Sequence, residues 1–395
     1  METLALPVSR RPFLAGFALA AGSACVPRIA AASAGIVRSI LDLLPSTEWE
    51  AISAGTSDFD CGPVIAAGLA GGGTIFFPAG RYVVATPIAF RPRIAGRFAP
   101  GVTLVGAGIG QTVFHDRTRA RALLDFDSGT NAETGFRAIN GIHLEGFTIE
   151  GGRAGATTAA IRFRGCYQSS IRQVYIVDRR GDGISIPCLL GDIDGSNMVT
   201  IEDVRIENCA GWGIAAAAAP GRNEISFLGL RRVMVQNCGI GAASGATPGS
   251  GGMQYKGQML TMDQCAFTEN RNVGLFIPGE AGLAVNIQVT STAFENNVGR
   301  HLLCTGVSVF RGTNLQLFSN DQRRATTGCE FSARTDTVRG VAIDGVLVRA
   351  TAGNAPYTAF RFEGPHLIPG SYDVRGVVWD DFGHPGQIKA VGVAL

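Results

Sequence analysis

One acidic group of residues has the types and spacing for acid–base chemistry. Asp178, Arg180 and Asp182 lie close together, and Asp192 and Asp194 follow in an irregular segment. Paired carboxylates can exchange protons with a substrate, and carboxylate oxygens are also good ligands for Ca²⁺. We therefore expect Asp178 and Asp182 to be catalytic and Arg180 to contact the substrate. Asp192 and Asp194 could hold a cation such as Ca²⁺; no other cofactor is implied. The alternative is a solvated turn with local salt bridges.

A second group, Tyr255 and Lys256, follows the glycine-rich segment 242–253. Abstracting the proton beside a uronate carboxylate needs a base, and a desolvated lysine or tyrosine can be that base. Lys256 and Lys389 are the lysines of a chain with 34 Lys and Arg residues. We expect Lys256 to be catalytic and Tyr255 to contact the substrate, with a surface lysine on a loop as the alternative.

The third group is Arg300 and His301, preceded by Glu269 and Arg271. An arginine can bind a carboxylate through two hydrogen bonds, and a histidine can move a proton near neutral pH. We expect His301 to be catalytic and the other three to bind substrate. Trp212 could stack on the face of a sugar, although buried packing explains it equally well. A histidine without a chemical role is the alternative for His301.

A weak internal repeat must position these residues. Short apolar runs end in a turn asparagine at Asn208, Asn237, Asn270, Asn296 and Asn320, with spacings of 29, 33, 26 and 24 residues. A period in this range, rich in short strands, is typical of a solenoid. Equivalent positions on neighbouring coils then lie about 4.8 Å apart. Carboxylates one or two coils apart could therefore meet the spacing that glycosidases need.

The pattern between the repeats predicts an all-β fold. Short strands separated by Gly and Asn, without long helical segments, favour parallel strands stacked coil on coil over alternating strands and helices. A β-sandwich or propeller is the second choice. Asp60 and the apolar residues 64–69, stopped by Gly71, Gly72 and Gly73, predict a short N-terminal helix that caps the solenoid. Cys209 and Cys238 follow turn asparagines, so we expect them to stack in the core.

The N-terminus resembles an export signal. Arg10 and Arg11 precede an apolar run that ends near Ala34, which is typical of a twin-arginine signal peptide over 1–34. We expect a periplasmic or secreted protein with one domain over 35–395; Cys25 leaves a lipoprotein anchor as an alternative. The signal carries the whole formal charge of +2. The remaining chain is near neutral, which argues against nucleic-acid binding, and no later segment is apolar enough to span a bilayer.

Three stretches near the N-terminus carry a resemblance to a known family: DFD at 58–60, GGGTIFFPAGRY at 71–82 and LVGAG at 104–108. They resemble the signature of the pectate-lyase-like superfamily, in the branch that holds rhamnogalacturonases and epimerases. The resemblance implies a right-handed parallel β-helix, but it does not specify a reaction. We expect a monomer or a homotrimer. Residues 181–186 also resemble the first catalytic motif of polygalacturonases, which implies a catalytic Asp182; the later motifs of that family are absent.

The sequence thus predicts an exported parallel β-helix that binds a polysaccharide, an acidic one being an option. Cleavage by lyase or glycosidase chemistry near the three polar groups is the favoured activity. A noncatalytic carbohydrate-binding or envelope protein, and a uronate epimerase, are the alternatives.

Overall fold

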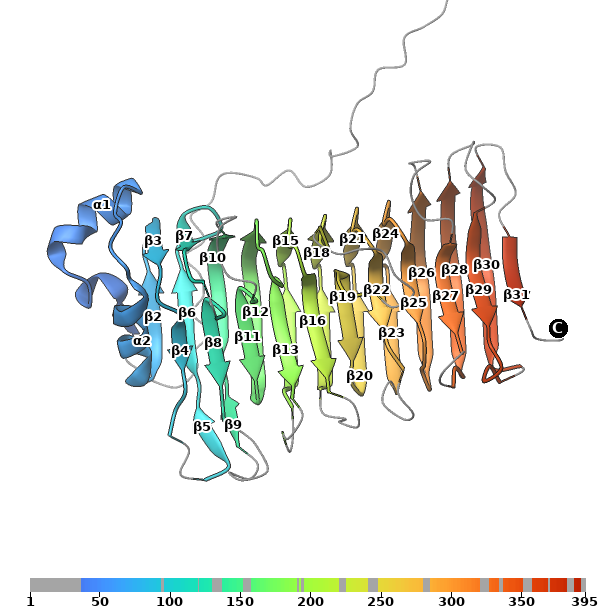
Figure 1. Ribbon diagram of the computed structural model, residues 1–395, viewed down its shortest axis with the longest axis horizontal. Coiled ribbons are helices and arrows are strands. Elements are labelled where there is room, and N and C mark those ends of the chain that lie inside the picture. Colours follow the sequence, from blue (N-terminus) through green and yellow to red (C-terminus); the bar gives the residue numbers. More distant parts are fainter. Residues whose placement is uncertain are drawn as a thin grey trace, which may run out of the picture. The chain divides into compact units, whose positions relative to one another are not determined.

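The protein is a stack of β-strand coils. The computed structural model describes residues 37–391 except 94–95, 120, 130–136, 152–157, 190–191, 193–194, 220–224, 241–247, 280–284, 320–326, 334–336, 351–356, 369 and 382–386. The expected signal 1–34, Cys25, Asp194 and Asn320 lie outside the described residues. Successive strands follow one another along a single axis, from β2 to β31 (Figure 1).

The strands form two sheets, and their pairings are parallel. Sheet A contains β1 (Val37–Ser39), β2 (Gly73–Phe77), β3 (Gly80–Val84), β5 (Phe98–Pro100), β6 (Val102–Gly106), β7 (Thr112–Asp116), β9 (Ala138–Asn140), β10 (His143–Gly151), β12 (Cys166–Val177), β14 (Asn197–Glu202), β15 (Arg205–Glu207), β17 (Ser226–Arg231), β18 (Met234–Gln236), β20 (Met259–Asp263), β21 (Ala266–Thr268), β23 (Asn286–Thr290), β24 (Ala293–Glu295), β26 (Phe310–Ser319), β28 (Val341–Ala350) and β30 (Tyr372–Asp381). Sheet B contains β4 (Ile88–Phe90), β8 (Leu124–Asp127), β11 (Ile161–Arg164), β13 (Ile184–Cys188), β16 (Trp212–Ala218), β19 (Gly251–Lys256), β22 (Val273–Ile277), β25 (Arg300–Cys304), β27 (Thr327–Ser332), β29 (Thr358–Glu363) and β31 (Gln387–Val391). Parallel pairing rules out a hairpin-connected sandwich.

Sheet A bends within most coils. The bend falls at a residue with positive φ, as at Gln173, Asp203, Arg232 and Gln264. It splits some coils into two strands, such as β14 and β15, while β12 continues through it. Each of these coils therefore presents three faces, two from sheet A and one from sheet B.

Two short α-helices, α1 (Trp49–Ala54) and α2 (Gly62–Ala70), and two 3₁₀ turns, η1 (Ile40–Asp42) and η2 (Ser46–Glu48), precede the first coils. Helix α2 lies where the sequence predicts a helix, and it buries Ile65 and Leu69 in the main core. Asp60 does not cap it in the standard way, since Cys61 is the N-cap residue. Its carboxylate instead accepts hydrogen bonds from the backbone N–H groups of Gly62 and Thr86. That α2 covers the open end of the solenoid stays a prediction.

The core is built from side chains that repeat from coil to coil. Phe77, Phe114 and Phe147 meet edge to face with ring centroids 5.0 and 5.1 Å apart, a favourable aromatic geometry. Cys209 and Cys238 are fully buried at equivalent positions, so their predicted stacking is confirmed. No helix in the described part of the chain has the length and apolar character needed to cross a bilayer.

The register corrects one feature of the predicted repeat. Asn270 is not equivalent to Asn237; its Nδ2 donates to Oδ1 of Asn297 over 2.9 Å inside the core. The strand pairing places Asn270 in line with Cys238. The outer turn position of that coil is occupied by Glu269, which has the positive φ of its neighbours in the column. The turn asparagines therefore belong to two columns, one outside and one inside.

Candidate functional site

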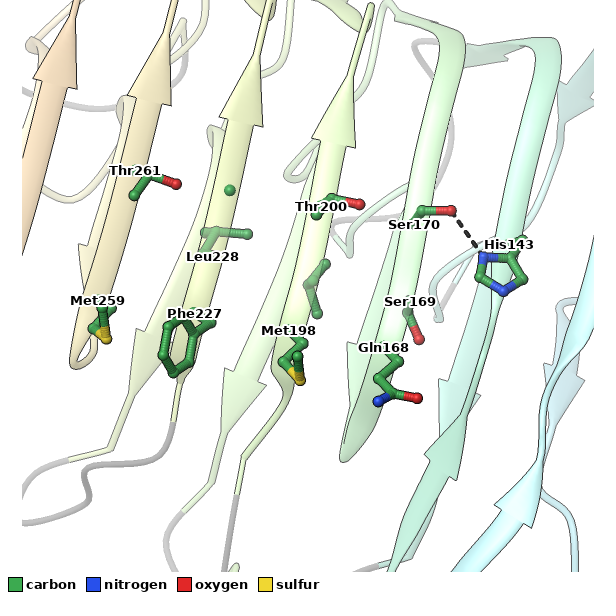
Figure 2. Close-up of a pocket in the computed structure, with 12 residues that line it drawn as sticks. His143, Gln168, Ser169, Ser170, Met198, Thr200, Phe227, Leu228, Met259 and Thr261 are labelled. Atoms are coloured by element: carbon green, nitrogen blue, oxygen red, sulfur yellow. Dashed lines mark hydrogen bonds between the residues drawn. The ribbon is translucent and has the colours of Figure 1, made fainter. Parts of the chain in front are cut away.

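A hollow lined by apolar and small polar side chains lies on the outer face of sheet A. Figure 2 shows its first part, with a volume of about 430 Å³, crossing β10, β12, β14, β17 and β20. A second part of about 450 Å³ continues to β23. The two parts share Thr200, Gly229 and Thr261, so we treat them as one groove, called the sheet A groove. Volumes of this size are usual for ligand sites.

The floor of the groove is a column of six uncharged positions, three of which carry a hydroxyl group. Strand register aligns the six positions His143, Ser170, Thr200, Gly229, Thr261 and Gln288. Each lies immediately before a buried aliphatic residue, so alternation along the strand turns it outward. The column spans five coil steps, or about 24 Å at about 4.8 Å per step. His143 Nδ1 and Ser170 Oγ are 2.9 Å apart.

One rim of the groove is apolar and exposed. Met198 and Phe227 each expose 51% of their surface, and Met259 continues the row on the next coil. Both exposed residues have φ near +56°, a conformation that bulky residues rarely adopt. An exposed flat ring beside a hydroxyl-lined floor can stack on the apolar face of a sugar.

The other rim carries charges of alternating sign. The register aligns Glu145, Arg172, Glu202, Arg231 and Asp263 on consecutive coils. Glu202 receives Arg172 and Arg231, each at 3.4 Å. Opposite charges on adjacent strands stabilise the stack, and the two arginines of this column are already paired with Glu202.

Some residues of the acidic group do come together at the edge between sheets A and B. Asp178 and Arg180 line a cleft of about 450 Å³ with Asn208 and Asn237. Asp178 Oδ1 accepts from Asn208 Nδ2 over 3.0 Å, and Asn208 Oδ1 accepts from Asn237 Nδ2 over 2.7 Å. Glu269 follows in the same column and accepts from Gln236 at 3.3 Å; Arg271 is exposed at the same edge. Asp178 thus ends a ladder of amide side chains.

Arg179, which lies between Asp178 and Arg180, makes its contacts inside the solenoid. Its guanidinium forms an ion pair with Asp116, and both side chains are almost fully buried. The arginine passes over Gly151, where an added Cβ would lie 2.8 Å from Arg179 Cδ. Glycine at this position is therefore required by the close approach.

Asp182 lies at the start of β13, apart from the cleft. Its Oδ1 accepts the backbone N–H of Trp212 over 2.7 Å, and an added Cβ on Gly211 would collide with it. Burial raises the pKa of Asp182 to about 6. Such a pKa suits a general acid near neutral pH, but the hydrogen bond alone gives the residue a structural role.

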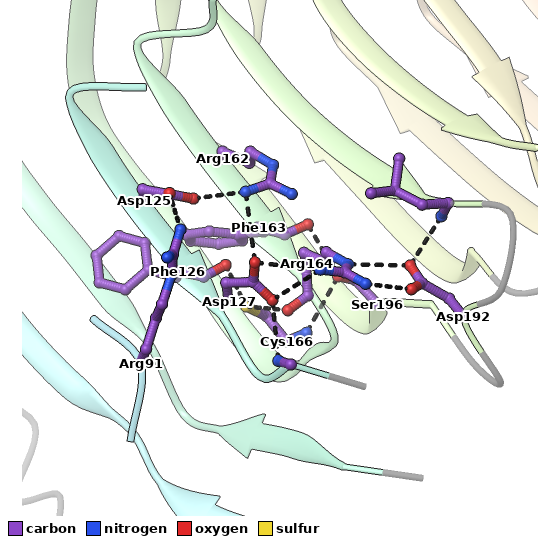
Figure 3. A network of polar contacts seen from close by, with 12 residues as sticks. Arg91, Asp125, Phe126, Asp127, Arg162, Phe163, Arg164, Cys166, Asp192 and Ser196 are labelled. Carbon is purple, nitrogen blue, oxygen red and sulfur yellow. Dashed lines mark hydrogen bonds and ion pairs between the residues drawn. The ribbon is translucent and has the colours of Figure 1, made fainter. Parts of the chain in front are cut away.

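The expected cation ligand Asp192 is instead paired with arginine. Figure 3 shows its carboxylate against Arg164, at 2.5 and 3.1 Å, and Arg164 also holds Asp127 at 3.2 Å. Asp125 is bound in turn by Arg91 and Arg162, each at 2.8 Å. We call these six residues the sheet B charge network. The described residues contain no group of three or more His, Cys, Asp or Glu side chains arranged for a metal ion. The expectation for Asp192 is therefore corrected.

The second predicted group lies in and against the core. Tyr255 is fully buried, and its hydroxyl donates to the carbonyls of Ile225 and Met259, over 3.1 and 2.8 Å. Burial also raises the pKa of its phenol. Lys256 ends β19 with only 6% of its surface exposed. The role of Tyr255 in binding substrate is thus corrected, because its hydroxyl is used inside the protein.

The third group divides between core and surface. His301 is fully buried, its Nδ1 lies 3.2 Å from Asn297 Nδ2, and burial lowers its pKa to about 3. It occupies a column that glycines fill on other coils, as at Gly252 and Gly274, where a side chain would point at the core asparagines. A proton shuttle at His301 is therefore a wrong expectation. Arg300 pairs with Glu330 at 2.7 Å.

The three groups do not form a single constellation. Register places Asp182 beside Trp212, and Arg300 three further steps along sheet B, through Gly251 and Val273. Four steps correspond to about 19 Å. Trp212 is packed rather than free to stack on a ligand, since it exposes 6% and lies against Phe276 with centroids 6.2 Å apart.

Sequence reasoning missed the sheet A groove. A detectable signal exists: each floor residue directly precedes a buried aliphatic residue such as Leu144, Ile171 or Ile201. Aligning the coils on these residues would have placed His143 and Thr200 in one outward column. Small hydroxylated side chains attract little attention when charged clusters are the search target.

The comparisons with known proteins concern the fold. No protein-family model and no curated protein sequence matches the chain. Among solved structures, the Agl-KA catalytic domain matches with a TM-score of 0.56 and 14% identity, over 88% of this chain and 59% of that domain. PfbA, a surface adhesin of Streptococcus pneumoniae, matches with a TM-score of 0.54 and 12% identity, over 84% and 83%. The chain thus spans less than two thirds of the Agl-KA domain.

Fold and neighbours together define the class of protein. It is a right-handed parallel β-helix, the fold that the N-terminal stretches predict. Identities this low establish the architecture alone, and function has to be argued from the sites.

Proposed function

We propose that the protein binds a polysaccharide along the sheet A groove. The observation that carries the proposal is the groove itself: a column about 24 Å long that includes the hydroxyls of Ser170, Thr200 and Thr261 and is flanked by the exposed Phe227 and Met198. Hydroxyl groups can donate to and accept from sugar hydroxyls, while an aromatic ring covers the C–H face of a sugar. A repeating floor suits a repeating ligand. A surface adhesin among the structural neighbours is compatible with a binding role.

The test is affinity electrophoresis through gels that contain a panel of polysaccharides. Phe227→Ala should weaken retention about five- to tenfold, since stacking and burial contribute roughly 1 kcal/mol. Val378→Ala is the matched control, because Val378 is an exposed apolar residue of sheet A, 61% exposed, on the distant strand β30. Retention by no polysaccharide, or equal loss in both variants, would refute the proposed function.

Cleavage is a second candidate function, with lyase or glycosidase chemistry at the cleft between the sheets. It is favoured by Asp178 and Arg180, which line that cleft. The chain would then act on the polymer it binds. Incubation with the same panel distinguishes the outcomes: an ultraviolet-absorbing unsaturated uronate indicates a lyase, and new reducing ends without it indicate a hydrolase. Neither product would leave binding as the function.

We further propose that the protein acts in the periplasm or outside the cell after twin-arginine export. The proposal is supported by Arg10, Arg11 and the apolar run that follows them. Fractionation of cells expressing the full chain tests it. Replacing both arginines by lysine should retain the protein in the cytoplasm, and unchanged export would contradict the proposal.

A further inference from the structure

We propose that the polysaccharide bound in the sheet A groove is uncharged, a neutral glycan rather than a polyuronate. This inference rests on the proposed function and names its ligand class. It follows from the distribution of charge across the groove, in which the six floor positions carry no charged group and the rim arginines Arg172, Arg231 and Arg232 are each paired with a carboxylate.

The floor offers hydrogen bonds without charge. Ser170, Thr200, Thr261 and Gln288 are neutral at every relevant pH. Burial lowers the pKa of His143, which favours the neutral form of its ring. A carboxylate on a sugar lying here would lose water without gaining a cation, which is unfavourable.

The arginines of the charged rim are already bound by carboxylates. Glu202 accepts Arg232 at 2.7 Å in addition to Arg172 and Arg231, and Asp203 holds Arg232 at 2.5 Å. Binding a polyuronate through these arginines would require breaking pairs that satisfy Glu202.

The remaining rim charges disfavour an acidic ligand. Asp263 lines the groove and Glu145 lies in the same column, so the rim has more carboxylates than arginines. Arg311 is exposed, but it belongs to the coil after Gln288 and lies outside the residues that line the groove. A polyuronate would therefore face like charge at the rim positions Glu145 and Asp263.

The contrast with the sheet edge supports the assignment. There, Arg180 is exposed beside the cleft and Arg271 is exposed one column further on. Among the described residues, these two arginines have no carboxylate partner and both lie away from the sheet A groove, while the exposed Arg311 occupies the position that follows Gln288 in the floor column. The neutrality of the groove is a local property of its lining.

The experiment compares wild type and Phe227→Ala in gels containing a neutral glucan, a neutral mannan, polygalacturonate or alginate. We expect retention by a neutral polymer, lost in the variant and changed by less than about twofold when salt is raised, since uncharged contacts are not screened. Retention by an acidic polymer that depends on Phe227 would keep the proposed function and refute this inference. Retention by none would refute the proposed function itself.

A second variant tests the inference by gain of function. Glu202→Gln removes the carboxylate that holds three arginines and keeps the size of the side chain. It should raise retention by polygalacturonate about two- to fivefold, the effect of freeing exposed rim charges, and leave retention by the neutral polymer unchanged. Glu207→Gln is the control, because it frees Arg205 outside the groove. Strong wild-type retention by polygalacturonate that Glu202→Gln leaves unaltered would overturn the inference.

Discussion

The most direct test of the sheet A groove is to fill it at Gly229. This residue is the one position of the floor column without a side chain, and both halves of the groove share it. An added Cβ would lie 3.6 Å from Thr261 Oγ1 and 3.7 Å from Thr200 Cγ2, which are ordinary van der Waals contacts. Its φ lies outside the left-handed region, so a side chain causes no backbone strain.

These distances separate folding from binding. Gly229→Ala should change the free energy of unfolding by no more than about 1 kcal/mol and can stabilise the fold, because alanine reduces the entropy of the unfolded chain. Gly229→Phe projects a ring into the middle of the floor. It should weaken polysaccharide retention at least about tenfold, equivalent to about 1.4 kcal/mol, because the polymer can no longer contact Thr200 and Thr261 together.

The assay is affinity electrophoresis of both variants, with urea unfolding to verify that each is folded. Gly229→Ala controls for the loss of glycine, and Gly229→Phe tests occupancy of the groove. A folded Gly229→Phe protein that is retained as strongly as wild type would refute the assignment of the ligand to this surface.

Two further predictions concern stability. Arg164→Met should lower the free energy of unfolding by about 3–5 kcal/mol, because it removes the guanidinium that pairs with the buried carboxylates of Asp127 and Asp192. Arg91→Met should cost less than about 1 kcal/mol, since Arg162 still holds Asp125; equal urea midpoints for the two variants would contradict the role of the sheet B charge network. The pKa of Asp182, raised to about 6 from 3.8, means that its contribution to stability is present below pH 3.8 and is lost as the pH rises through 6. The loss is about 3 kcal/mol at about 1.4 kcal/mol per pH unit, and thermal melts of Asp182→Asn should lack it; parallel pH profiles for wild type and variant would show that Asp182 is not perturbed.

The sequence allowed the architecture to be predicted because the periodic signal is local. Short strands ending in asparagine or glycine recur wherever a coil turns, and Cys209 and Cys238 reveal the stacking of equivalent positions. The sequence did not show which residue of each turn faces the core and which faces the outside. A turn residue and its successor point to opposite sides, so Asn237 faces the outside and Asn270 the core, although both follow similar strands.

The expectations for His301 and Tyr255 differ from the structure for a related physical reason. His301 and Tyr255 are polar residues whose partners are core amides and backbone carbonyls, and sequence spacing alone cannot distinguish such a residue from an exposed one. The column that holds glycine at Gly252 and Gly274 would have indicated an inward position for His301. Charged residues were expected to do chemistry, yet Asp192 and Arg164 satisfy each other. Neutral floor residues were overlooked.

All eight cysteines of the described chain are free and buried, and they are distributed over its coils from Cys61 to Cys329. Burial raises the pKa of several of these thiols, to about 12 at Cys304, so a folded coil hides its thiol from alkylating reagents. Each thiol becomes reactive only when the coil that contains it unfolds. The order in which the thiols are modified, measured by mass spectrometry, would therefore show whether unfolding begins at an end of the solenoid or in its middle. No engineered label is needed.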